Sequence, residues 1–110
     1  MARRDRVIPS SGNVFADLKL PDADERLAKA ELVSVIRRIL RERDLTQREA
    51  GDLLGLRQPD VSDLLRGNLA RFSRERIERF LVLLGMDVSI RVAPKPPRRA
   101  SGRLTVEVSA

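Results

Sequence analysis

The chain has 110 residues, a formal net charge of +6 and a sequence pI near 11.1. This length suits one compact domain with flanking tails. Because the chain has no cysteine and no histidine, disulfides, thiolate catalysis and zinc sites built on those ligands are excluded. No apolar stretch is long enough to span a membrane, and the N-terminal sequence lacks the apolar segment of a secretion signal. We therefore expect a cytoplasmic protein with no membrane partner.

The positive charge is unevenly distributed along the chain. Residues 1–6 contribute +2 and residues 94–110 contribute +3, so the residues between them carry only +1. Within that middle part, residues 35–79 hold eleven basic and eight acidic residues. An excess of basic residues favours a polyanionic partner, although solvated arginine-rich helix faces are also common.

In chain order, residues 1–21 form a predicted N-terminal arm, because prolines, serines and a glycine interrupt any regular pattern. Asp22 and Glu25 then form an acidic pair typical of a helix start, and we predict a helix from there to about Arg43. The buried stripe of this helix consists of Leu32, Val35, Ile36, Ile39 and Leu40.

The segment 46–67 predicts two short helices joined by a tight turn. Thr46 and Glu49 have the spacing of a capping box, in which each side chain satisfies a free amide at a helix start. Gly55 ends this helix, since glycine adopts the left-handed conformation without steric cost. The second helix begins with Gln58, and Pro59 fits its first turn.

Apolar spacing supports the same arrangement. Gly51 costs helix stability and therefore suggests a place where the second helix approaches too closely for a side chain. A helical hairpin in any small all-α protein is the alternative, but the cap, the small residue, the turn glycine and the apolar positions all fall in the register of a helix-turn-helix. The apolar positions are Ala50, Leu54, Leu56, Val61 and Leu64.

A further helix completes the predicted DNA-binding domain, residues 22–86. Ser73 caps its start, and Phe72 and Ile77 occupy the two positions of a hydrophobic staple. Gly85 ends it. Its buried face consists of Ile77, Phe80, Leu81 and Leu84.

Residues 87–110 form a predicted C-terminal extension. Asp87–Val92 and Leu104–Val108 alternate polar and apolar residues, which predicts two β-strands, and the basic, proline-rich linker 94–102 separates them. Because two strands alone are marginally stable, they should pack on the helices, pair with a second copy or add to a partner's sheet. An intramolecular ribbon and a dimer both remain open.

Three stretches carry a family resemblance: SSGNVFADL at the end of the N-terminal arm, GLRQPDVSDLLRG in the second helix, and the FS opening of the last helix. Over residues 10–93 the chain resembles the XRE-type helix-turn-helix proteins that include HigA-like antitoxins. The resemblance implies a mainly α, λ-repressor-like bundle of four to five helices, here with a short C-terminal β extension. It also implies a homodimer on a palindromic operator in double-stranded DNA, autorepression of a toxin–antitoxin operon, and neutralisation of a cognate RelE- or HigB-like mRNA interferase toxin.

Positions of this chain that match the family's motif suggest roles for individual side chains. A glutamine amide can bind adenine, an arginine can bind guanine or phosphate, and a carboxylate facing DNA is tolerated where it accepts from a cytosine amino group. Asp63 we expect to be solvated or ion-paired, and each single arginine also fits an ordinary surface position. The predicted base-reading residues are Arg57, Gln58, Asp60 and Ser62. The predicted phosphate-binding residues are Thr46, Gln47, Arg48, Arg66, Asn68 and Arg71.

The hypothesis favoured by these patterns is a sequence-specific repressor that is also an antitoxin. A stand-alone, phage-like XRE-type repressor is the first alternative. A protein-binding neutraliser that no longer binds DNA is the second, and Asp60 and Asp63 are its best support. We do not expect an enzyme, a cofactor or a metal site, because no nucleophile constellation, glycine-rich phosphate cradle or histidine accompanies these carboxylates.

Overall fold

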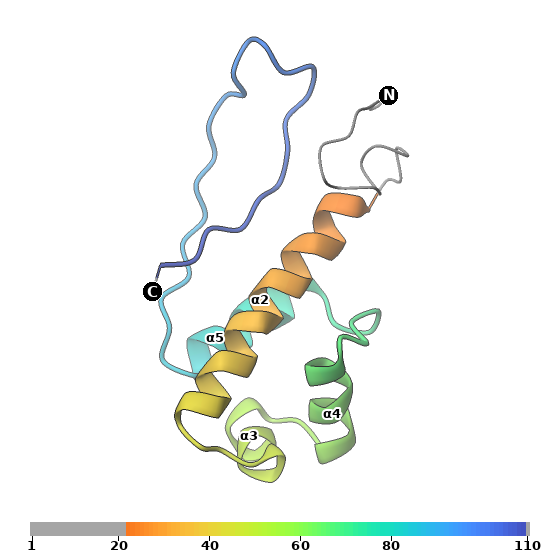
Figure 1. The fold of residues 1–110 in the computed structure, drawn as a ribbon, viewed down its shortest axis with the longest axis vertical. Coiled ribbons are helices and arrows are strands. Elements are labelled where there is room, and N and C mark those ends of the chain that lie inside the picture. The colour runs from red at the N-terminus through yellow and green to blue at the C-terminus, as the bar shows by residue number, and fades with distance from the viewer. Residues whose placement is uncertain (1–21, 110) are drawn as a thin grey trace.

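The computed structural model describes residues 22–109, which form a helical bundle followed by a long loop (Figure 1). The predicted N-terminal arm lies outside the described residues. Within them there are four helices and no β-strand, so the mainly α prediction is confirmed. None of these helices is long and apolar enough to cross a lipid bilayer. The helices are α2 (Ala23–Glu42), α3 (Gln47–Leu54), α4 (Gln58–Arg66) and α5 (Arg74–Leu83).

The core lies where α2 crosses the three shorter helices. The predicted apolar stripe of α2 is buried throughout, and Val33, which the predicted stripe omitted, is fully buried as well. Phe72 and Phe80 meet edge to face, with ring centroids 6.1 Å apart, between α2 and the start of α5. Leu56 is only partly buried, and the other predicted core positions of α3, α4 and α5 are buried. The two helices of the helix-turn-helix are thus held by a shared core.

The helix ends confirm one predicted cap and contradict another. Ser73 caps α5 by accepting a hydrogen bond from the Arg76 amide at 3.1 Å. Asp22 precedes α2 but makes no side-chain cap bond, because its backbone (φ −106°, ψ 19°) is not in the extended conformation that an N-cap needs. Its carboxylate instead accepts from Arg26 Nε at 2.9 Å.

The predicted C-terminal β extension is wrong for the described residues. Asp87–Val92 and Leu104–Val108 run as two extended stretches of one loop (Figure 1), but no backbone hydrogen bond joins them. Of the alternating apolar residues, Val88 and Val106 pack against the core, whereas Ile90 and Val92 are exposed. Residues 22–109 also do not contain the fifth helix allowed by the prediction.

Candidate nucleic-acid interface

The first helix of the pair, α3, begins with the predicted capping box. Thr46 Oγ1 accepts from the Glu49 amide at 3.1 Å, and the Thr46 amide donates to Glu49 Oε1 at 2.8 Å. The Glu49 carboxylate therefore already occupies one backbone donor at this helix end. The Thr46 hydroxyl hydrogen is the group that this arrangement leaves to donate to a phosphate.

The turn between the helices is set by two glycines. Gly55 takes the left-handed conformation, with φ of 72°, as predicted. A Cβ on Gly51 would stand 2.6 Å from the carbonyl oxygen of Leu56, closer than real Cβ atoms approach. The close approach predicted for Gly51 is therefore confirmed, but the crowding atom is a turn carbonyl rather than the second helix itself. The close approach of the Leu56 carbonyl to Gly51 fixes the angle at which α4 leaves the turn.

The second helix, α4, presents its N-terminal end to solvent. Arg57 is the N-cap residue with extended backbone, Gln58 opens the helix and Pro59 lies in its first turn. The side chains of Arg57 and Gln58 are exposed, and Ser62, one turn further, is half-buried. Because an α-helix end of this kind fits the major groove, Gln58 is in a suitable place for base recognition.

The far end of α4 is tied to α2. Arg37 Nε donates to the carbonyl oxygen of Leu65 at 2.8 Å, which satisfies one of the free carbonyls at the helix C-terminus. No local pattern indicates this contact, since the two residues are 28 positions apart.

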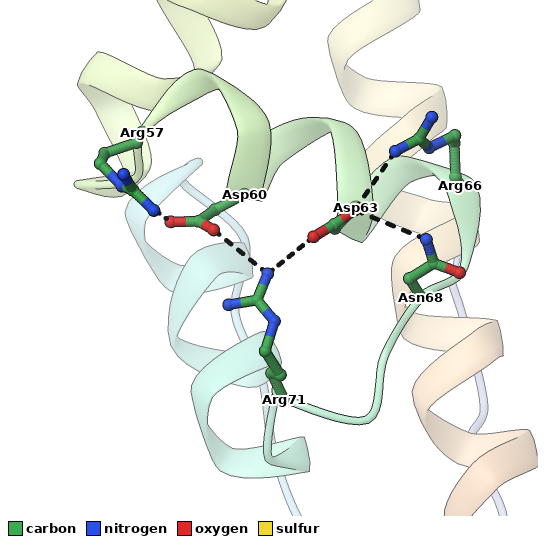
Figure 2. A network of polar contacts seen from close by, with 6 residues as sticks. All are labelled: Arg57, Asp60, Asp63, Arg66, Asn68 and Arg71. Atoms are coloured by element: carbon green, nitrogen blue, oxygen red, sulfur yellow. Dashed lines mark hydrogen bonds and ion pairs between the residues drawn. The ribbon is translucent and has the colours of Figure 1, made fainter.

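Both aspartates of α4 point toward Arg71, which follows the helix in the loop before α5 (Figure 2). Arg71 Nη2 lies 2.7 Å from Asp63 Oδ2 and 3.1 Å from Asp60 Oδ1. Arg57 approaches Asp60 from the other side, with 3.5 Å between Nε and Oδ2. One guanidinium therefore bridges two carboxylates one turn apart on the same helix.

Asp63 is the centre of this network. It also accepts from Arg66 at 3.3 Å and from Asn68 at 3.5 Å (Figure 2). The hydrogen bond from Arg71, followed by those from Asn68 and Arg66, lowers the pKa of the Asp63 carboxyl below its ordinary value. The ion-paired role expected for Asp63 is confirmed.

The network neutralises the surface on which DNA contacts were predicted. Residues 46–71 contain four basic and four acidic residues. Three of the four arginines pair with Asp60 or Asp63. Any DNA contact here depends on directed hydrogen bonds more than on bulk charge.

The predicted site residues fall into three groups in the structure. The ion-pair network brings together five of them, Thr46 belongs to the capping box, and the remaining four make no side-chain hydrogen bond or ion pair within residues 22–109. No contact tests their DNA roles, which stay predictions. The network members are Arg57, Asp60, Arg66, Asn68 and Arg71. The remaining four residues are Gln47, Arg48, Gln58 and Ser62.

The basic linker 94–102 lies far from these residues. In Figure 1 its tip and α3 are at opposite ends of the longest axis, which measures 46 Å. The charge of the linker therefore does not add to the surface around α4.

The comparisons with known proteins agree with this geometry. A family model described as a helix-turn-helix domain matches residues 14–93. A solved structure, named as a candidate XRE family transcriptional regulator, is 37% identical in sequence, with a TM-score of 0.76. The match covers 81% of this chain and 100% of that chain. No curated protein matches the chain significantly.

Proposed function

Because this chain belongs to the helix-turn-helix domain family, we propose that it is a sequence-specific transcriptional repressor that binds a palindromic operator as a homodimer. DNA-binding transcriptional regulation follows from the family and from the likeness to an XRE-type regulator. The observation that carries the finer proposal is the exposed start of α4, where Arg57 is the N-cap and Gln58 is the first residue of a helix whose C-terminal end is held by Arg37 of α2. Homodimers suit such a site, since one helix contacts only a few base pairs.

The proposed roles divide between bases and backbone. Gln58 donates to and accepts from adenine, and Arg57 and Ser62 bind guanine or phosphate beside it. Asp60 accepts from a cytosine amino group while Arg71 holds its other oxygen. The phosphate contacts come from Thr46, Gln47, Arg48, Arg66, Asn68 and Arg71.

The test compares two exposed glutamines, each at the first position of its helix. Gln58→Ala should weaken binding to the promoter of the chain's own gene by roughly 5- to 150-fold, while random DNA of equal length is bound as before. Gln47→Ala, the matched control, should weaken both DNAs by the same factor, because phosphate contacts carry no sequence information. Fluorescence anisotropy at several salt concentrations measures both. Equal losses for Gln58→Ala on the two DNAs would remove its base-reading role.

We further propose that the repressor is the antitoxin of a toxin–antitoxin operon. The support is the resemblance of residues 10–93 to HigA-like antitoxins, together with the XRE-type relative. The partner would be a RelE- or HigB-like mRNA interferase encoded beside it. Co-expression from a dual plasmid tests this: the neighbouring small protein should arrest growth alone, and this chain should restore growth and co-purify with it. If the neighbouring gene causes no arrest, the stand-alone repressor is favoured.

One observation favours a protein-binding neutraliser as the second candidate. Asp60 and Asp63 form ion pairs with Arg57, Arg66 and Arg71. The net charge of residues 46–71 is zero. Salt dependence separates the two functions. A repressor should lose affinity for its promoter steeply between about 50 and 200 mM salt, whereas the neutraliser should bind no DNA at either concentration. In both cases we propose a binding role and no catalytic activity.

A further inference from the structure

The chain leaves an apolar strip uncovered where α5 continues into the C-terminal extension. Met86 and Val88 pack partly against the core, but Ile90 and Val92 are 71% and 90% exposed. Val82 on α5 is 55% exposed and lines an open pocket of about 510 Å³ together with Val88, Ile90 and four charged residues of α5, Glu75, Arg76, Glu78 and Arg79. The strip therefore extends from Val82, near the end of α5, along the segment that follows the helix.

The segment 86–92 alternates strictly along its length. The even-numbered residues are apolar, and Asp87, Ser89 and Arg91 between them are polar and exposed. This is the pattern of a strand with one face on a core. Yet within residues 22–109 no backbone hydrogen bond joins it to the other extended stretch, 104–108.

Like charges oppose pairing within one chain. The antiparallel register that places Val88 opposite Val106, the two valines on the core, also places Asp87 opposite Glu107 and Arg91 opposite Arg103. Like charges directly opposite each other destabilise a strand pair. The second stretch is also engaged elsewhere, because the Leu104 amide donates to Asp24 Oδ2 at 3.1 Å. The backbone of 86–92 therefore has more of its hydrogen-bonding groups available for strand pairing than that of 104–108.

The same segment is complementary to a second copy of itself. In an antiparallel pair centred on Ser89, Asp87 lies opposite the partner's Arg91, and Val88 lies opposite the partner's Ile90. Two opposite-charge pairs form on one face, and an unbroken apolar row forms on the other. Centring the pair on Val88 or on Ile90 keeps the apolar row but loses both charge pairs, so charge selects one register.

We propose that residues 86–92 pair with the same residues of a second copy in this register, and that the ribbon covers the apolar strip of both α5 helices. A two-stranded ribbon needs such backing to be stable in water. In Figure 1, α4 lies on the other side of α2 from this segment, so both α4 helices stay accessible. The inference rests on the proposed homodimer and deepens it by locating the contact between its copies.

Charge reversal tests the register directly. Asp87→Arg and Arg91→Asp should each raise the dimer dissociation constant by on the order of tenfold or more, because each replaces two opposite-charge pairs by two like-charge pairs. The double variant Asp87→Arg/Arg91→Asp, with the charge of the natural chain, should restore dimerisation to within about twofold. The two single variants, when mixed, should form a heterodimer more readily than either forms a homodimer. Sedimentation velocity measures the dissociation constants, and circular dichroism checks that every variant folds.

Glu107→Arg, an equivalent reversal on the other stretch, is the control and should leave the dimer unchanged. A natural chain that stays monomeric at 100 µM, single variants without effect, or a double variant that fails to restore dimerisation would each overturn the proposal. Promoter binding distinguishes the two levels. If the single variants dimerise as well as the natural chain and still bind the palindromic promoter as dimers, the proposed register is wrong and the repressor function stands. If the single variants weaken the dimer as expected but neither they nor the natural chain binds DNA, the repressor function is wrong and the register stands.

Discussion

The helix-turn-helix, residues 46–67, and the C-terminal extension, described to residue 109, complete their interactions in different ways. In the first, a capping box starts α3, Arg37 of α2 holds the C-terminal end of α4, and Val61 and Leu64 are fully buried. In the second, Ile90 and Val92 stand in solvent and the backbone pairs with no strand. A helix makes its hydrogen bonds within itself, whereas a strand needs another edge. One region completes its interactions within a single chain, whereas the other leaves apolar side chains exposed and its backbone without strand pairing.

The largest expected effect tests the buried half of this comparison. Leu64→Ala should lower the free energy of unfolding by about 2–5 kcal/mol, because it opens a cavity where α4 meets the core. Leu53→Ala, on the exposed side of α3, should cost no more than about 0.5 kcal/mol. Urea unfolding followed by circular dichroism measures both. Similar costs for the two leucines would mean that α4 is not packed as described.

The next effect tests the tight turn against the open loop. Gly51→Ala should cost about 1–3 kcal/mol from the clash with the Leu56 carbonyl, which outweighs the helix propensity gained, about 1 kcal/mol. Gly102→Ala has open space around it and should leave stability within about 0.5 kcal/mol. Thermal unfolding of the two variants side by side is the measurement. A stabilised Gly51→Ala would show that the turn can move.

A smaller effect separates a threonine that caps a helix from one that does not. Thr46→Ala removes half of the capping box and should cost about 1 kcal/mol. Thr105→Ala, at an exposed position in the extension, should change the free energy of unfolding by less than about 0.5 kcal/mol. Urea titration again measures the difference. If Thr105→Ala costs as much as Thr46→Ala, the extension holds contacts that its exposure does not indicate.

These regions also mark what the sequence could and could not predict. The capping box, the turn glycine and the start of α4 were predictable because their causes lie within a few residues of each other. The bond from Arg37 to Leu65 and the clamp of Arg71 on two aspartates were not, since they join residues that only the fold brings together. The alternation of 87–92 correctly indicated one apolar face, but no pattern within it supplies the neighbouring edge that would make it a strand in one chain.

The smallest effect concerns Asp63, whose pKa is lowered from 3.8 by the hydrogen bonds of Arg71, Asn68 and Arg66. A carboxyl with a lowered folded-state pKa contributes stability above its unfolded pKa and loses it as the pH falls through the folded one. The stability gap between the natural chain and Asp63→Asn should therefore be constant at neutral pH and narrow below about pH 3.8. Acid titration of both chains, followed by circular dichroism, checks this. A gap that stays constant down to about pH 2 would mean that the charge of Asp63 does not stabilise the fold.

The same variant tests what this network does to DNA binding. Asp63→Asn removes the carboxylate that pairs with Arg66 and Arg71, so Arg66 becomes available to phosphates while Arg71 keeps its 3.1 Å pair with Asp60. Random DNA should then be bound more tightly, and its salt dependence should steepen by about one counterion. Promoter DNA should gain by the same factor, because phosphate contacts carry no sequence information and the base contacts from Gln58 do not change. Asp63 would thus limit contacts with the DNA backbone, and an unchanged salt dependence would show that Arg66 stays away from that backbone even when Asp63 no longer pairs with it.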